Sequence, residues 1–286
     1  MSSTIPDGPG VQLPLVPGET DASIAASRRI STPVVAGVAL IAVFGLIAAF
    51  GQEVWEYPVL RALNANAGRW ALLDRTMHAL TTRDLLEGVV FVTLLWYLWF
   101  HTTDTDIRAR LLTGTLAASL AGVSSRLLQI GLPTHLRPLH TPTLGFVPPI
   151  GVEPDALNHF NSFPSDHGAI YFGLALVIHR THSRLGIFAF AWAAIVNIAR
   201  IYDGYHFPSD VLGSIGLSIL AVSLFENRWC QQVVRRVLVF EQTRRPEFYA
   251  MAFVITYQVA TLFDDVRQIG RGFASVLLHH DPFGGG

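Results

Sequence analysis

Charged residues are scarce in this chain, since aspartate, glutamate, lysine and arginine make up only 14% of its 286 residues. A soluble globular domain usually has about 25%. The deficit, together with 51% hydrophobic residues and a positive mean hydropathy, favours a membrane protein over a soluble one.

The chain also has no lysine, one cysteine and almost no net charge. All 20 basic residues are arginine, which by itself indicates no function. The formal net charge of −1 argues against a nucleic-acid-binding surface. The single cysteine, Cys230, excludes an internal disulfide framework and a cysteine-rich metal site.

The hydrophobic residues gather in six runs, each of which predicts a membrane-crossing helix. A helix of about 20 residues spans a bilayer core of about 30 Å, so the shorter runs must reach into the interface. A cleaved signal peptide is the alternative for the first run, but its apolar core would have only about 7–15 residues. We expect an all-α bundle of six transmembrane helices at 31–51, 85–100, 110–132, 167–179, 184–202 and 210–225.

The segments outside the bundle differ in composition. Residues 1–30 are rich in proline, glycine and serine, which predicts a disordered cytoplasmic tail. Residues 31–226 form the predicted six-span domain. For the C-terminal tail, 227–286, we expect an interfacial or re-entrant helix at 248–263 rather than a seventh span, because that apolar run is short.

One tetrapeptide, Phe-Pro-Ser-Asp, occurs twice, at 163–166 and at 207–210. Segments on the cytoplasmic side of a membrane usually carry more basic residues than those on the outer side. With six spans, the arginines of this chain follow that rule if the N-terminus is cytoplasmic. Both copies then open helices at the outer face, at the starts of the fourth and sixth runs. A histidine follows the first copy, His167, and another precedes the second, His206.

Three polar clusters lie near this face, where ionisable groups at membrane depth mark function or ion pairing. The first holds Arg126 and Arg137, whose planar guanidinium groups fit phosphate oxygens. They could instead be a snorkelling and a loop arginine. The second holds Ser165 and His167 at a predicted helix start, a natural anion site. Its alternative is plain N-capping by Ser165.

The third cluster holds Arg200, His206 and Asp210. A carboxylate near a histidine fixes its tautomer. The nearby acids and histidines lack an established metal-ligand spacing, which argues against a metal enzyme. Together the clusters suit displacement at phosphorus, with arginines and amides on the phosphoryl oxygens, one histidine attacking and the other protonating the leaving oxygen.

These clusters resemble the motifs of the type 2 phosphatidic acid phosphatase (PAP2)/haloperoxidase superfamily: Lys-x6-Arg-Pro, Pro-Ser-Gly-His and Ser-Arg-x5-His-x3-Asp. This chain has Arg137-Pro138, then Pro164-Ser165-Asp166-His167, and Ala199-Arg200-x5-His206-x3-Asp210. The resemblance covers about residues 31–226 and implies a PAP2-like bundle. The Pro-Ser-Asp-His form looks like that of bacterial undecaprenyl-diphosphate phosphatases.

The resemblance also implies a role for each matching residue. His206 would be the nucleophile that forms a phosphohistidine, Asp210 would orient it, and His167 would protonate the leaving group. No metal or other cofactor would be needed. Phosphate would be bound by Arg137, Arg200 and Ser165.

Three positions depart from the family pattern. Ile130 occupies the place of the first-motif lysine, so Arg126, one helical turn earlier, is the expected substitute. Ala199 replaces the serine before the arginine. Asp166 replaces the motif glycine and brings a negative charge next to the anion site.

Three functions follow as hypotheses. The first is a lipid phosphatase in the bacterial inner membrane, acting at the outer face on an isoprenoid diphosphate, such as undecaprenyl diphosphate, or on phosphatidate. The second is a phosphotransferase that passes the phosphoryl group to another acceptor. The third is a non-catalytic protein that binds or transports lipid phosphates. The partners implied are the bilayer and its lipid phosphates, and no nucleic acid.

Overall fold

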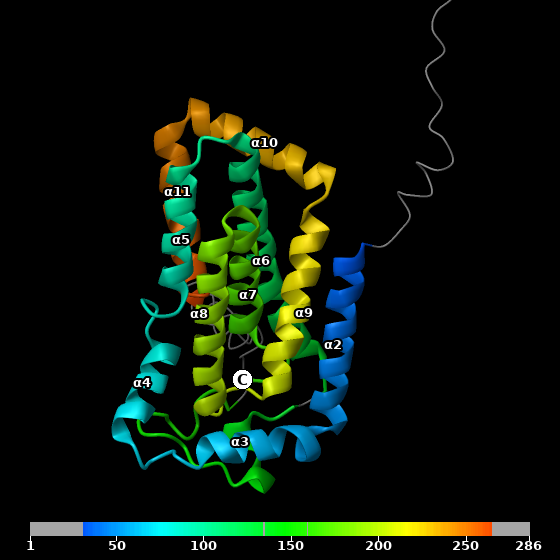
Figure 1. Cartoon of the computed structure of the whole chain (residues 1–286), viewed down its shortest axis with the longest axis vertical. Helices are drawn as coiled ribbons and strands as arrows, with labels where there is room; N and C mark the ends of the chain where they lie inside the picture. The colour runs from blue at the N-terminus through cyan, green and yellow to red at the C-terminus, as the bar shows by residue number, and fades with distance from the viewer. Residues whose placement is uncertain (1–30, 134, 159, 265–286) are drawn as a thin grey trace, which may run out of the picture. The chain divides into compact units, whose positions relative to one another are not determined.

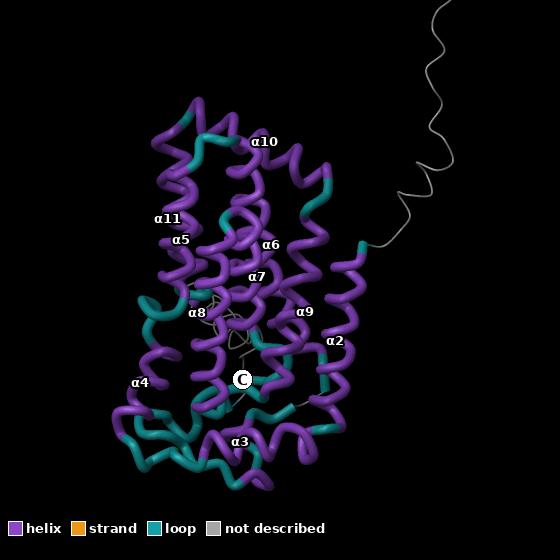
Figure 2. The backbone as a smooth tube through the Cα atoms, in the orientation of Figure 1, coloured by secondary structure: helices purple, strands orange, loops and turns teal. Residues whose placement is uncertain are grey.

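The computed structural model describes residues 31–133, 135–158 and 160–264, so the tail predicted for residues 1–30 lies outside it. All regular structure in the described residues is helical (Figures 1 and 2). The long helices are α2 (Thr32–Phe50), α5 (Gly88–His101), α6 (Thr105–Gly131), α7 (Asp166–Thr181), α8 (Ser183–Tyr202), α9 (Pro208–Phe225), α10 (Arg228–Thr243) and α11 (Arg245–Ala260).

Shorter helices connect them at the lower end of Figure 1. A π-helix (Gln52–Glu56) leads into α3 (Tyr57–Asn64), and α4 (Ala71–Thr82) precedes α5. Two 3-10 turns, Pro138–His140 and Pro142–Leu144, lie in the connection between α6 and α7.

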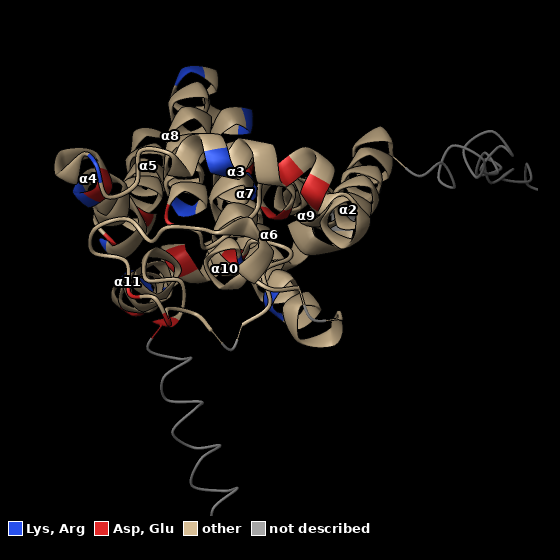
Figure 3. Ribbon diagram, turned by 90° about the horizontal axis from the view of Figure 1, so that it is seen from below, with Lys and Arg blue, Asp and Glu red and all other residues tan. Residues whose placement is uncertain are grey.

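Each of the six predicted runs folds as a helix, and the all-α prediction is confirmed for the described residues. Within residues 31–133, 135–158 and 160–264, four helices are long and apolar enough to cross a membrane, α2, α6, α8 and α9. The helix α5 is apolar but has 14 residues, and α7 has 16. In the view from below, most of the ribbon is neither acidic nor basic (Figure 3). These features support an integral membrane protein, while the count of six spans stays a prediction.

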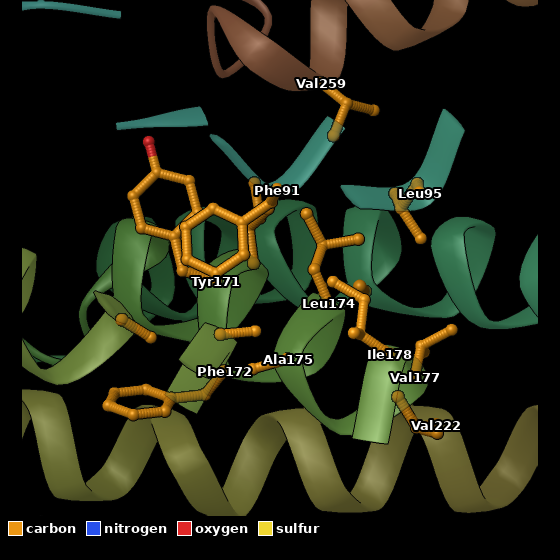
Figure 4. Packing of buried hydrophobic residues seen from close by; sticks show 14 of the residues in the cluster. Phe91, Leu95, Tyr171, Phe172, Leu174, Ala175, Val177, Ile178, Val222 and Val259 are labelled. Carbon is orange, nitrogen blue, oxygen red and sulfur yellow. The ribbon is translucent and has the colours of Figure 1, made fainter. Parts of the chain in front are cut away.

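The helix α7 is the centre of the bundle and packs against α5, α6, α8 and α9. Figure 4 shows its side chains between α5 and α9, with Phe91 of α5 against Tyr171 of α7. The two rings stack with their centroids 4.8 Å apart. Small residues let the backbones approach on the other side, because Gly114 of α6 faces Val177 of α7.

Both copies of Phe-Pro-Ser-Asp begin helices, as predicted, but in different registers. In the first copy Ser165 is the N-cap residue of α7, and its Oγ accepts a hydrogen bond from Gly168 N at 3.1 Å. In the second copy the N-cap residue of α9 is Phe207, and Pro208 is the first helical residue. The two starts touch, since Ser165 N donates to Asp210 O at 3.1 Å.

The C-terminal helices lie at the opposite end and along one side (Figure 1). The amphipathic α10 packs against α6, and Arg235 pairs with Asp106 at 2.7 Å. The next helix, α11, packs along α5 until Ala260 meets Gly88, where a Cβ would overlap the Ala260 backbone. The predicted domain boundary after residue 226 stays a prediction.

Close packing of α6 on α7 should be sensitive to a single methyl group. A Cβ at Gly114 would overlap both γ carbons of Val177, a β-branched side chain with little rotamer freedom in a helix. We expect Gly114→Ala to lower stability by about 1–3 kcal/mol, measured as thermal unfolding in detergent. The matched control is Gly131→Ala, at the end of the same helix, where a Cβ would have no neighbour within 4 Å among the described residues. Equal melting temperatures for the two variants would contradict this packing.

Candidate active site

A cavity of about 1040 Å³ lies where the end of α6, the connection to α7, and the facing ends of α7 and α8 come together. One part of its wall is polar, with Arg126, Arg137, Asp166, His167 and Arg200. The other part is apolar. It includes Ile130, Leu132, Leu136, Leu157 and Phe160.

The sequence clusters meet here because α6 holds the chain that precedes α7. Ser125 Oγ and Gln129 Nε2 both donate to Pro164 O, at 2.9 and 2.6 Å. Asn161 Nδ2 donates to Gln129 O at 3.0 Å. These hydrogen bonds fix the loop segment that leads into the cap residue Ser165, and so they set the position of the first turn of α7.

Asp210 and His206 form a buried pair at the start of α9, and neither has exposed surface. Asp210 Oδ2 accepts hydrogen bonds from Phe207 N at 2.7 Å and from Ser162 Oγ. The same oxygen lies 3.5 Å from His206 Nδ1. His206 Nδ1 is 3.1 Å from Ser162 O. Because a carbonyl only accepts, Nδ1 carries the proton in this arrangement.

The other ring nitrogen of His206 faces Arg137. Arg137 Nη1 is 3.3 Å from His206 Nε2, and a guanidinium only donates, so Nε2 is the acceptor and has no proton. Burial takes the imidazole out of water, and Arg137 adds a nearby positive charge; together they lower the pKa of His206 to about 4. At neutral pH His206 is therefore an uncharged base with its lone pair on Nε2.

Arg137 lies between His206 and the cavity, and most of its N–H groups are already used. Nε donates to Phe160 O at 3.2 Å, Nη2 to Asn161 O at 3.0 Å, and Nη1 to Tyr205 O. The side chain lines the cavity, whereas His206 does not. An anion can therefore reach Nε2 only if the Arg137 side chain shifts from its present contact.

Arg200 and Arg126 reach the cavity from α8 and α6. Arg200 is buried, its Nη1 is 3.3 Å from Glu87 Oε1, and its Nε has no hydrogen-bond partner among the described residues. A buried, unused donor at a cavity wall suits an anionic ligand. Arg126 donates to Gln129 Oε1 at 2.7 Å and lies over the Phe160 ring, 4.0 Å from its centroid.

In the second motif, Ser165 caps a helix, whereas His167 lines the cavity. Ser165 is fully buried and its Oγ caps α7, which is the local alternative foreseen from the sequence. His167 lines the cavity, and its ring is nearly perpendicular to that of Tyr171, with the centroids 5.9 Å apart. Its Nδ1 is 2.9 Å from Asp166 Oδ1 and its Nε2 is 3.9 Å from Glu87 Oε2.

Three residues at the site were missed by motif reasoning. Glu87 contacts both Arg200 and His167. It could have been found in the sequence as a lone carboxylate inside a predicted span. Ser162 holds both Asp210 and His206, and no sequence signal singles it out. His135 Nε2 lies 3.3 Å from Asp210 Oδ1. Its position in the predicted outer loop gave no hint of this pairing.

Comparison with known proteins matches residues 133–231 to the family model described as the PAP2 superfamily. That segment contains Arg137-Pro138 of the first motif and the whole of the second and third motifs, and it excludes Ile130 and Arg126. The resemblance indicated by the motifs is therefore confirmed.

Curated relatives cover different shares of the chain. The bacitracin transport permease protein BcrC of Bacillus licheniformis is 38% identical over 21% of this chain and 30% of its own length. The putative undecaprenyl-diphosphatase YbjG of Escherichia coli is 33% identical over 46% of this chain and 62% of its own length. The undecaprenyl-diphosphatase BcrC of Bacillus subtilis is 25% identical over 59% of this chain and 82% of its own length. The match thus spans less than two thirds of the first two relatives.

A solved structure is also similar, that of a transmembrane PAP2-type phosphatidylglycerolphosphate phosphatase from Bacillus subtilis. The identity is 22% and the TM-score is 0.47, over 67% of this chain and 94% of that chain.

The buried, neutral state of His206 predicts a pH dependence of stability. The unfolded chain binds a proton at this histidine below about pH 6.5, whereas the folded chain does so only near pH 4. Between these values the unfolded state binds more protons, so the free energy of unfolding should fall as the pH falls. We expect His206→Asn, which keeps a donor at the Nδ1 position, to reduce this slope in detergent melts.

The control is His101→Gln, because His101 is exposed at the end of α5. It should leave the slope between about pH 6.5 and pH 4 unchanged. An equal slope in wild type and in His206→Asn would show that His206 is not held neutral by the fold.

Proposed function

We propose that this protein is an integral-membrane lipid phosphatase that releases phosphate through a phosphohistidine on His206. The observation that carries the proposal is the tautomer of His206. Its Nδ1–H is engaged by Ser162 O next to Asp210, and this leaves Nε2 as an unprotonated nucleophile beside an arginine-lined cavity. Nucleophile, orienting carboxylate and anion-binding groups are the parts that such a reaction needs.

The reaction proceeds in two steps. The substrate phosphate takes donors from Arg200 and Arg126 and draws Arg137 away from His206. The Nε2 lone pair then attacks phosphorus, the bond to the leaving oxygen breaks, and His167 gives that oxygen its proton. In the second step water attacks the phosphohistidine, His167 takes a proton from the water, and phosphate leaves with His206 neutral again.

The buried contacts support metal-independent chemistry. The positive charge that stabilises the equatorial oxygens comes from guanidinium groups, which remain charged at neutral pH. Although burial lowers the pKa of Arg137, it does so only to about 10.

The shape of the cavity supports a lipid substrate. A volume of about 1040 Å³ is at the upper end of the usual range for ligand pockets and far exceeds the needs of phosphate alone. The apolar residues Ile130, Leu132 and Leu136 line one side and can hold a hydrocarbon chain. We propose an isoprenoid diphosphate, undecaprenyl diphosphate first, because two relatives are named for its hydrolysis; phosphatidate is the alternative.

We place the protein in the bacterial inner membrane with a cytoplasmic N-terminus and the active site at the outer face. The arginine distribution supports this orientation. The six helices α2 and α5 to α9 would each cross the bilayer, and α10 would lie at the cytoplasmic surface with its polar face toward the headgroups.

A second function is favoured by the contact of Arg137 with His206 Nε2. If this contact persists when ligand is bound, the protein binds lipid phosphates without cleaving them. One relative bears the name of a transport permease. A third, phosphotransfer from the same phosphohistidine to an alcohol, differs only in its acceptor.

The nucleophile assignment predicts a large loss of activity on one substitution. His206→Asn should reduce phosphate release from undecaprenyl diphosphate at least about 1000-fold, because no covalent intermediate can form. His101→Gln is the control and should keep wild-type activity. Phosphate would be measured with purified protein in detergent, after a melt has shown that both variants are folded. Residual release by His206→Asn close to the wild-type rate would exclude the mechanism.

Metal independence is tested by the same assay in excess chelator across a panel of lipid phosphates and diphosphates. We expect unchanged rates with chelator and a preference for the isoprenoid diphosphate. Loss of activity that returns on adding a divalent cation would point to a metal enzyme. Binding of every lipid with no release of phosphate would support the binding protein, and phosphate transfer to an added alcohol would support the phosphotransferase.

A further inference from the structure

Asp166 stands where the second motif of the family has glycine, and it contacts the proposed leaving-group acid. Asp166 Oδ1 is 2.9 Å from His167 Nδ1 and also accepts a hydrogen bond from His167 N at 3.0 Å. One oxygen thus receives both N–H groups of the next residue, which fixes the carboxylate and the ring relative to each other. Both side chains line the cavity.

The two histidines of the site have opposite surroundings. His206 has a carbonyl and a carboxylate at Nδ1 and an arginine at Nε2, which favours a neutral ring. His167 has a carboxylate at each nitrogen, Asp166 at Nδ1 and Glu87 at Nε2. Negative charges near an imidazole favour its protonated form.

Other charged groups near His167 limit this effect. Glu87 is paired with Arg200, so its charge is partly neutralised, and Arg137 and Arg126 face the same cavity. The Glu87 contact is also 3.9 Å long, beyond the length of a hydrogen bond. Asp166, at hydrogen-bond distance from Nδ1, therefore supplies the closer negative charge.

We propose that Asp166 is a positioning residue that holds His167 protonated on both nitrogens, with Nε2–H directed to the leaving oxygen. This deepens the proposed function and rests on it. His206 and His167 are then each paired with an aspartate, and the two aspartates have opposite tasks. Asp210 with Ser162 keeps a lone pair on His206, and Asp166 keeps a proton on His167.

A negative charge beside an anion site has a further consequence. Asp166 repels the substrate phosphate, so its presence weakens binding while it supports proton donation. A substitution that removes the charge should therefore lower kcat and lower KM together. A purely structural role, such as an acidic residue in the first turn of α7 that favours the helix dipole, predicts neither change.

The test is the pH profile of kcat for undecaprenyl diphosphate with wild type, Asp166→Asn and Asp166→Gly, the residue of the family motif. Activity should decline on the alkaline side as His167 loses its proton. We expect both variants to move this decline to lower pH by about 1 unit or more, the effect of losing one adjacent opposite charge. KM at neutral pH should fall. Asp155→Asn, which removes an exposed aspartate of the outer loop, is the matched control and should match wild type.

A second measurement keeps this result separate from the proposed function. The protonation of His167 can be followed by NMR of protein labelled with ¹⁵N-histidine in detergent, with the signal assigned by its loss in His167→Gln. His167 should titrate at a higher pH in wild type than in Asp166→Asn. Equal titration in the two proteins would overturn the proposal even if wild type is active. Inactive wild type with a shifted titration would instead overturn the phosphatase assignment and leave the pairing intact.

Discussion

The carboxylate of Asp210 accepts hydrogen bonds from Phe207 N and Ser162 Oγ, and it lies 3.5 Å from His206 Nδ1. Its backbone carbonyl accepts a hydrogen bond from Ser165 N. One residue in the first turn of α9 therefore holds the N-cap of its own helix, the chain before α7, and His206, the proposed nucleophile. A buried carboxylate is tolerable only when it is surrounded by donors, and here each donor belongs to a segment that the site needs.

At the same end of the bundle, the buried and half-buried basic and imidazole groups are compensated by specific hydrogen-bonding or ion-pair partners. Arg200 is paired with Glu87, His167 with Asp166, and Arg137 with three backbone carbonyls. Each of these groups has a partner, yet Arg200 Nε makes no hydrogen bond within the part of the chain that the structure describes. A phosphate entering this cavity would find a network of fixed dipoles and charges, which is the arrangement that stabilises developing charge without reorganisation.

Much of this arrangement could be predicted from the sequence, and the reason is periodicity. His206 and Asp210 are four residues apart at a helix start, so their proximity follows from local geometry, and the apolar runs give the helices within a few residues. The contacts of Arg137 could not be predicted, because they depend on where the backbone carbonyls of Phe160, Asn161 and Tyr205 lie in the folded loop. Glu87 joins the site from a turn about 80 residues before His167, a tertiary contact that no local pattern encodes. Ser165 shows the opposite case, in which the local N-cap preference predicts the observed contact.

The central claim is that His206 carries the phosphoryl group, and rapid acid-free quenching of the enzyme during turnover tests it most directly. Wild-type protein mixed with a terminally ³²P-labelled isoprenoid diphosphate in chelator should yield labelled protein, stable in alkali and labile in acid, with the label on the peptide that contains His206. His206→Asn should yield no labelled protein under the same conditions. Turnover by wild type with no labelled protein, or a label on any other peptide, would contradict the account.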